Sequence, residues 1–135
     1  MYIKNIVLLL FILFTLPNVS MCQVKSTSSG DVTFCGKPGE SGPTGGNYTI
    51  QELTDCDFTI TPLDTNFKIA EFQLSIYGKD ALFVPIEIKI KGNKIPDEYR
   101  AKILKEAKNV FLEYIKATAS DGTIRLMKPV GVRIQ

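Results

Sequence analysis

Residues 110–134 read VFLEYIKATASDGTIRLMKPVGVRI, and this stretch decides the fold class. Its first half is rich in β-branched and aromatic side chains, which favour strands. Asp121-Gly122 follows, and this dipeptide between two apolar runs is the strongest short-range signal of a β-hairpin. We therefore predict a strand, a turn and a returning strand that Pro129 interrupts: 110–118, 120–122, and 123–127 with 130–134.

Two further strands are predicted upstream of this hairpin. Residues 67–77 alternate between polar and apolar side chains, and the apolar side switches near Ala70, which predicts a bulge or bend. After a turn at 78–80, residues 82–90 alternate cleanly, but Pro85 among them has no backbone N–H to donate. This second strand is therefore expected to lie at a sheet edge or to carry a bulge.

One helix is predicted between these strands and the hairpin. Pro96 suits its first turn, and Asp97 and Glu98 follow near the positive end of the helix dipole. Asn109 is expected to end it in a left-handed conformation. Apolar side chains four residues apart form its core-facing stripe: Tyr99, Ile103 and Ala107. The prediction is a mostly β, α+β domain: an antiparallel, sandwich-like fold with one short helix packed on it.

The segment between residues 32 and 60 gives weaker signals. Short strands are predicted over 32–35 and 58–60. Five glycines and two prolines within 36–47 predict a loop. Thr49 and Glu52 have the spacing of a capping box, so one helical turn is an option there.

The first 22 residues have the layout of a secretory signal peptide. Lys4 supplies a positive charge, and an eleven-residue run that is apolar except for Thr15 follows it. Cleavage after Cys22 is expected, while a lipid-modified Cys22 and a retained membrane anchor remain alternatives. All three imply export, with the periplasm as the expected location. The rest of the chain is then a flexible lead-in over 23–31 and a single domain over 32–135.

Composition narrows the classes of function. The chain has 135 residues, of which 44% are hydrophobic and 22% charged, as in an ordinary globular domain. A formal net charge of +2 does not favour nucleic-acid binding. Histidine is absent, which excludes His-based triads and most zinc and haem sites. We therefore predict no catalytic, cofactor-binding or metal-ligating residues, and we interpret Asp55 and Asp57 as solvated residues at a loop end.

Two features each allow two interpretations. Cys35 and Cys56 either form a disulfide, which an oxidising compartment permits, or remain two buried thiols. Several lysines lie near the 82–90 strand and on the helix, and they either bind an anionic partner or have no binding role. We favour the second interpretation, in which they protect the strand edge and form the solvent-exposed face of the helix. They are Lys79, Lys89, Lys91, Lys94, Lys102, Lys105 and Lys108.

Four motifs along the chain resemble one protein family in the family's own order. They are CGK at 35–37, GGNYTIQEL at 45–53, DFTITPLDTNFKIAEF at 57–72 and IKATASDGTIRLMKPVGVRIQ at 115–135. Together they are similar to the last periplasmic domain of the GldM family, called PorM in some members. These are the gliding-motility and type IX secretion motor proteins of Bacteroidota. The resemblance covers residues 32–135.

This resemblance implies a protein-binding domain and no enzymatic activity. GldM proteins span the inner membrane, dimerise, and meet ring proteins beneath the outer membrane through their last domain. The motor helix and the intermediate domains have no counterpart in this sequence, so we do not expect it to couple proton flow to motion. We expect instead an exported, non-enzymatic protein-binding module, an accessory of the gliding or type IX secretion machinery.

The expected partner is a protein of the cell envelope, with a homodimer as a further option and membrane contact only if Cys22 carries a lipid. The candidate interaction residues are Asp121, Gly122 and Arg125 of the hairpin, together with the strand edge near Pro85. One alternative is an exported structural or carbohydrate-binding β-sandwich unrelated to motility. A third and less favoured hypothesis is a small hydrolase or an inhibitor of one.

Overall fold

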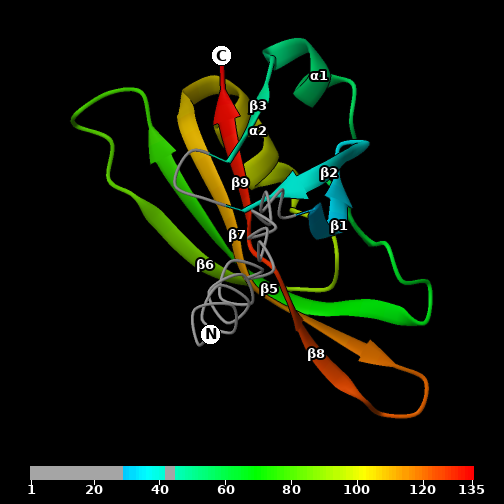
Figure 1. Ribbon diagram of the computed structural model, residues 1–135. Coiled ribbons are helices and arrows are strands. Elements are labelled where there is room, and N and C mark those ends of the chain that lie inside the picture. The colour runs from blue at the N-terminus through cyan, green and yellow to red at the C-terminus, as the bar shows by residue number, and fades with distance from the viewer. Residues whose placement is uncertain (1–28, 42–44) are drawn as a thin grey trace, which may run out of the picture.

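The computed structural model describes residues 29–41 and 45–135 (Figure 1). The expected signal peptide over 1–22 lies outside these residues. Along the chain the elements are β1 (Ser29–Phe34), β2 (Lys37–Glu40), β3 (Gly46–Tyr48), α1 (Ile50–Thr54), β4 (Ile60–Pro62), β5 (Phe67–Gly78), β6 (Ile86–Lys91), α2 (Asp97–Glu106), β7 (Ala107–Ala119), β8 (Ile124–Met127) and β9 (Val130–Ile134).

The strands form two sheets. The larger has the order β3-β9-β7-β5-β6, with β8 also paired to β7, and the smaller has the order β2-β1-β4. All pairs are antiparallel except β3 with β9, which run parallel. The fold is therefore mostly β and sandwich-like, as predicted, although it carries two short helices instead of one.

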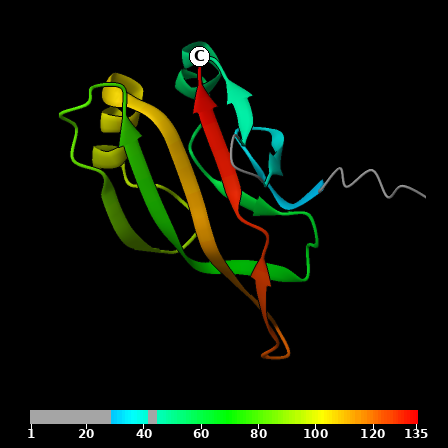
Figure 2. The same cartoon turned by 60° about the vertical axis from the view of Figure 1, so that its left-hand side comes forward.

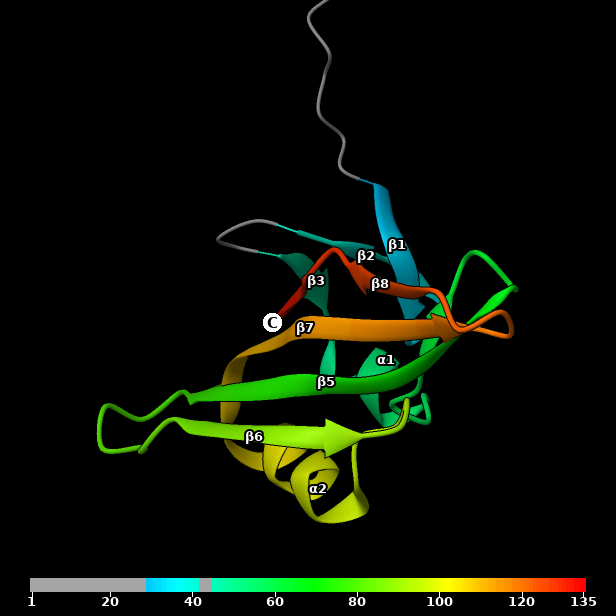
Figure 3. The same cartoon turned by 90° about the horizontal axis from the view of Figure 1, so that it is seen from below.

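One apolar core joins both sheets and both helices. Figures 2 and 3 show α2 lying against one face of the large sheet. Its Ile103 is buried there, together with Leu53 of α1 and Phe34 of β1. The opposite face of the large sheet is open to solvent at β6 and β8, where Lys89 and Leu126 are exposed. The sheet thus separates a packed interior from an open outer face.

The register of the long central pair, β5 and β7, shifts at three places, and two of them flank Glu71. Ile69 pairs with Ala117 and Glu71 with Lys116, so β5 carries one extra residue at Ala70, where a bulge was predicted. Glu71 pairs with Lys116 and Gln73 with Glu113, so β7 carries a compensating extra residue. The inward side of β5 therefore switches at Ala70, as its sequence indicates.

The 82–90 prediction is right about the edge and wrong about the start. β6 is the edge strand of the large sheet, but it begins at Ile86, directly after Pro85. The preceding residues form a loop. Leu82 and Val84 therefore follow the alternating pattern of a strand in the sequence but are not part of one. Asp80 accounts for this, because its side chain accepts a hydrogen bond from the Leu82 N–H and fixes a turn.

The predicted lead-in and loop near the start of the described chain both contain strand. Ser29, Gly30 and Asp31 belong to β1, which pairs Ser29 with Glu40. The 36–47 segment, predicted as a loop, contains β2 and the start of β3. Its glycines permit this, because a Cβ on Gly45 would lie 2.2 Å from the backbone of Gly131. Close approach to the Gly131 backbone, rather than loop flexibility, explains Gly45.

Smaller corrections concern single residues. Cys35 was assigned to a strand but forms, with Gly36, the two-residue turn between β1 and β2, where both have positive φ. The strand predicted over 58–60 is instead β4, which begins at Ile60. Phe58 cannot belong to it, because its φ of 58° is not that of an extended strand. The predicted capping box at Thr49 is present and begins α1.

The helix ends earlier than predicted. α2 stops at Glu106, and Ala107 already has extended backbone angles, so β7 follows without a loop. Asn109, expected to cap the helix, instead pairs with Tyr77 of β5 and Arg133 of β9. Asn109 is therefore paired on both sides within the sheet and does not cap the helix.

Candidate functional site: the β7–β8 arm and its outer face

The predicted interaction hairpin is an arm that projects from the body of the domain. The last residues of β7 pair with β8, and the arm extends past β9 (Figures 1 and 2). The Asp121-Gly122 turn forms as predicted, with a φ of 88° at Gly122. The Ala119 N–H donates to the Thr123 carbonyl at 2.8 Å and closes it. The sequence signal thus places the arm correctly.

Asp121 and Arg125 stabilise the arm itself. The Asp121 carboxylate accepts a hydrogen bond from the Thr123 N–H at 2.9 Å. A hydrogen bond from the Thr123 side chain, and secondarily this bond from the Thr123 N–H, hold the pKa of Asp121 below its ordinary value. The Arg125 guanidinium carbon lies 4.7 Å from the centre of the Phe67 ring, a cation–π contact at the root of the neighbouring strand. Asp121, Gly122 and Arg125 therefore lie on one arm. Asp121 and Gly122 form its turn, so their role there is structural.

The outer face of the arm carries the exposed apolar side chains that sequence reasoning missed. Tyr114, Ile124 and Leu126 are 68%, 58% and 67% exposed. Tyr114 has a φ of 50° and occupies the bulge of β7, which displaces its ring from the strand's regular alternation. The signal for this bulge is present in the sequence, because the inward residues step from Leu112 to Ile115 rather than by two.

Two shallow hollows meet at Tyr114 and Leu126. One has a volume of about 300 Å³ and extends over β5 and β6 toward Phe72 and Lys89. The other, about 310 Å³, extends toward Met127 and Pro129. Each hollow has both Tyr114 and Leu126 in its wall.

A small ion-pair group borders the first hollow. The Glu71 carboxylate lies 3.4 Å from the Lys89 ammonium and 3.9 Å from that of Lys116. Lys116 also pairs in register with Leu126 across the arm. The surface is thus apolar in the centre, with charged groups along one side.

The strand edges of the described residues differ in how they are protected. β6 carries Glu87, Lys89 and Lys91 on its exposed side and is preceded by Pro85, which are features that discourage pairing with another strand. β8 pairs with β7 alone within the described part of the chain, and its exposed positions include Ile124 and Leu126. The predicted edge near Pro85 is therefore blocked by charge, whereas the β8 edge is apolar.

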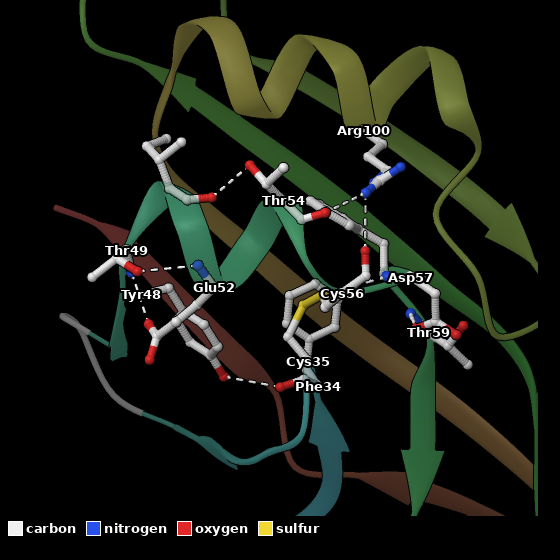
Figure 4. The surroundings of a disulfide bond; sticks show 12 residues. Phe34, Cys35, Tyr48, Thr49, Glu52, Thr54, Cys56, Asp57, Thr59 and Arg100 are labelled. Carbon is white, nitrogen blue, oxygen red and sulfur yellow. Dashed lines mark hydrogen bonds between the residues drawn. A yellow bond between two sulfur atoms is a disulfide. The ribbon is translucent and has the colours of Figure 1, made fainter.

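A disulfide packs against the apolar core (Figure 4). Cys35 and Cys56 are bonded, with their Cα atoms 5.2 Å apart, and join the β1–β2 turn to the segment after α1. Arg100 of α2 donates through Nη2 to the carbonyls of Thr54 and Cys56, at 2.9 and 3.0 Å. Three separate elements are therefore held together at this point.

Tyr48 lies beside this junction and is fully packed. Its hydroxyl donates to the Phe34 carbonyl at 3.3 Å, and its ring contacts that of Phe34 edge-on. Burial, with smaller effects from Glu40 and Glu52, raises the pKa of Tyr48 to about 12. This tyrosine supports the fold rather than an exposed site.

No protein-family model matches this chain, and no curated protein matches it either. Within residues 29–41 and 45–135, no group of three or more His, Cys, Asp or Glu side chains is arranged to hold a metal ion. The arm and its outer face are therefore assigned from geometry alone.

Proposed function

We propose that this chain is an exported, non-enzymatic protein-binding module that takes up an extended segment of a partner protein along β8. The observation that carries the proposal is an edge strand with an apolar surface. Within the described residues β8 pairs only with β7, and its exposed Ile124 and Leu126 lie beside Tyr114. Natural proteins usually protect an edge strand with charge or proline, as β6 is protected here. An edge that keeps Ile124 and Leu126 exposed is suited to accept another strand.

The two hollows give this edge a means of selection. In strand addition, main-chain hydrogen bonds supply affinity, and pockets for alternate side chains supply specificity. Tyr114 and Leu126 stand between the hollows of about 300 and 310 Å³, so each would take one side chain of the bound segment. The expected ligand is an extended peptide with apolar side chains on one face.

The disulfide supports export. Bonds such as Cys35–Cys56 form and persist mainly in oxidising compartments, including the bacterial periplasm. The apolar segment near the N-terminus favours the same location. We therefore place the partner in the cell envelope. The motifs similar to the GldM family further suggest the ring proteins of the gliding or type IX secretion machinery as partners.

The test is affinity capture from the native envelope with two matched double variants. The chain is tagged at Gln135, and its partners are crosslinked and identified. Ile124→Lys with Leu126→Lys adds edge-protecting lysines to β8, and we expect recovery of the partner to fall at least about tenfold. Ile50→Lys with Leu63→Lys adds the same charge at two exposed apolar positions outside both proposed surfaces and should leave recovery unchanged.

Three results would contradict parts of this proposal. Equal recovery with both double variants would exclude β8 as the binding edge. A dimer in sedimentation equilibrium that the β8 variant abolishes would make a second copy of this chain the occupant. Binding of a glycan array with no protein partner would favour the carbohydrate-binding alternative.

A further inference from the structure

The loop between β5 and β6 carries the most exposed apolar side chains of the described residues. Leu82 is 89% exposed and Val84 79%. The loop projects past the end of the sheet, on the side of α2 (Figure 3). Two aliphatic side chains at the tip of a projecting loop gain nothing from water, so their position calls for a functional explanation.

The loop is a fixed structure that presents these two side chains outward. The Asp80 carboxylate accepts from the Leu82 N–H at 2.9 Å, and the Phe83 N–H donates to the Asp80 carbonyl at 3.0 Å. The Phe83 ring packs closely on Gly78, where a Cβ would lie 2.2 Å from a ring atom. Because Phe83 points inward, its neighbours Leu82 and Val84 point away from the domain.

Lysines from two elements lie at the base of the loop. Lys79 of the loop joins Lys102 and Lys105 of α2 around an open hollow of about 570 Å³. The Lys79 N–H donates to the Glu106 carbonyl at 2.9 Å, which ties the loop to the end of the helix. The Lys102 ammonium lies 5.7 Å from the centre of the Phe83 ring. Three of the lysines noted in the sequence are thus brought together.

The charge balance of this corner is positive. Asp80 and Glu106 also line the hollow, so three ammonium groups face two carboxylates. One of those carboxylates is engaged in the turn, since Asp80 accepts the Leu82 N–H. The ammonium groups remain exposed beside the aliphatic tip. An anionic surface with an apolar layer beneath it complements this arrangement.

We propose that this corner docks on the surface of an anionic phospholipid bilayer. Leu82 and Val84 enter the interfacial layer, and Lys79, Lys102 and Lys105 face the lipid phosphates. A protein partner fits less well, because a stable protein interface needs about 800 Å² on each side, and two side chains on a convex tip supply far less. A bilayer requires only a few such side chains with basic residues beside them.

This contact is independent of the β8 proposal and of a lipid on Cys22. Neither helix in the described ranges is long and apolar enough to cross a membrane. The proposed contact also revises the interpretation of the lysines. Lys79, Lys102 and Lys105 act as a binding group, whereas Lys89 and Lys91 protect the β6 edge.

The test is vesicle sedimentation with the chain from Gln23 onward, which contains the whole described core from Val32 to Ile134. Vesicles of phosphatidylcholine alone are compared with vesicles containing one-third phosphatidylglycerol. We expect binding to the anionic vesicles that weakens as salt is added. Leu82→Asn with Val84→Asn should lower the partition coefficient about tenfold.

The charge contribution is tested with two triple variants of equal net charge. Lys79→Glu, Lys102→Glu and Lys105→Glu together should abolish binding to anionic vesicles. The matched control places the same charges elsewhere: Lys68→Glu, Lys91→Glu and Lys94→Glu. We expect the control to lose at most about threefold through its net charge alone.

Three outcomes would overturn the proposal. Equal losses in the two triple variants would mean that net charge, not this corner, attracts the chain. Retention of full binding by Leu82→Asn with Val84→Asn would exclude insertion of the tip. Capture of an acidic protein by this corner without vesicle binding would replace the bilayer by a protein partner. Far-ultraviolet circular dichroism of each variant distinguishes these results from misfolding.

Discussion

The disulfide is expected to contribute about 3 kcal/mol to the stability of this domain. Cys35 and Cys56 are 21 residues apart in sequence, and closing a loop of that length removes conformational entropy from the unfolded chain. The loop-entropy relation gives about 11 cal/mol/K for this length, which is about 3 kcal/mol at 25 °C. Replacing both cysteines by alanine should remove this stabilisation. The midpoint of thermal unfolding should then fall by roughly 10–15 °C.

Equilibrium unfolding in urea measures this effect directly. The chain from Gln23 is compared with its Cys35→Ala, Cys56→Ala variant, and with itself in the presence of a reducing agent. Both perturbations should give the same loss, because each opens the same loop. A loss below about 1 kcal/mol in both would refute the reasoning. It would show that the unfolded chain already restricts this loop without the covalent bond.

Three further predictions concern side chains whose roles differ. Burial raises the pKa of Tyr48 to about 12 from 10.0, so its contribution is complete below pH 10 and is lost as the pH rises to 12. Wild-type stability should therefore fall about 2–3 kcal/mol more than that of Tyr48→Phe between pH 10 and 12; parallel curves would refute this. Arg100→Met should cost about 2 kcal/mol in urea unfolding, because two carbonyls lose a charged donor, whereas the exposed Arg133→Met should cost under about 0.5. Tyr114→Asn should leave stability unchanged or raise it by up to about 1 kcal/mol, since Asn tolerates the left-handed backbone, yet lower partner recovery at least about tenfold. A large loss of stability in Tyr114→Asn would contradict the assignment of this ring to binding.

Local patterns in the sequence predicted the hairpin and the strands of the second half of the fold, but not the start of β6 or the end of α2. The Asp121-Gly122 turn, the Ala70 bulge and the paired strands follow from turn chemistry and from the side-chain period of two. The 36–47 segment could not be assigned this way, because its strands depend on distant partners. β2 pairs with β1, and β3 pairs in parallel with β9, some 85 residues later in the chain. Glycines that permit close backbone approach look the same in sequence as glycines in a loop.

The hairpin that carries the candidate site was predicted from the sequence, but its exposed apolar side chains were not. Asp121 and Gly122 mark the arm, yet they are occupied in its turn. The exposed group at Tyr114 and Leu126 depends on a bulge and on the pairing of β8 with β7. Both are properties of register, which single residues do not reveal. In the β5–β6 corner, Lys79 is more than twenty residues from Lys102 and Lys105 in sequence and meets them only through folding.

The two proposed surfaces lie at opposite ends of the same strand pair. In β5 and β7, Phe67 pairs with Ala119 next to the turn of the arm, and Gly78 pairs with Ala107 beside the β5–β6 loop. Through β7, Ile124 and Leu126 of β8 lie level with Lys68 and Glu71 of β5, which are ten and seven residues from Gly78. At about 3.3 Å per residue, a segment bound along β8 would therefore lie about 20–35 Å along the strands from the lipid-binding corner. Because neither surface overlaps the other, both are expected to be occupied at once. Vesicles loaded with this chain should then sediment the partner, and the Ile124→Lys, Leu126→Lys variant should release the partner while staying on the vesicles itself.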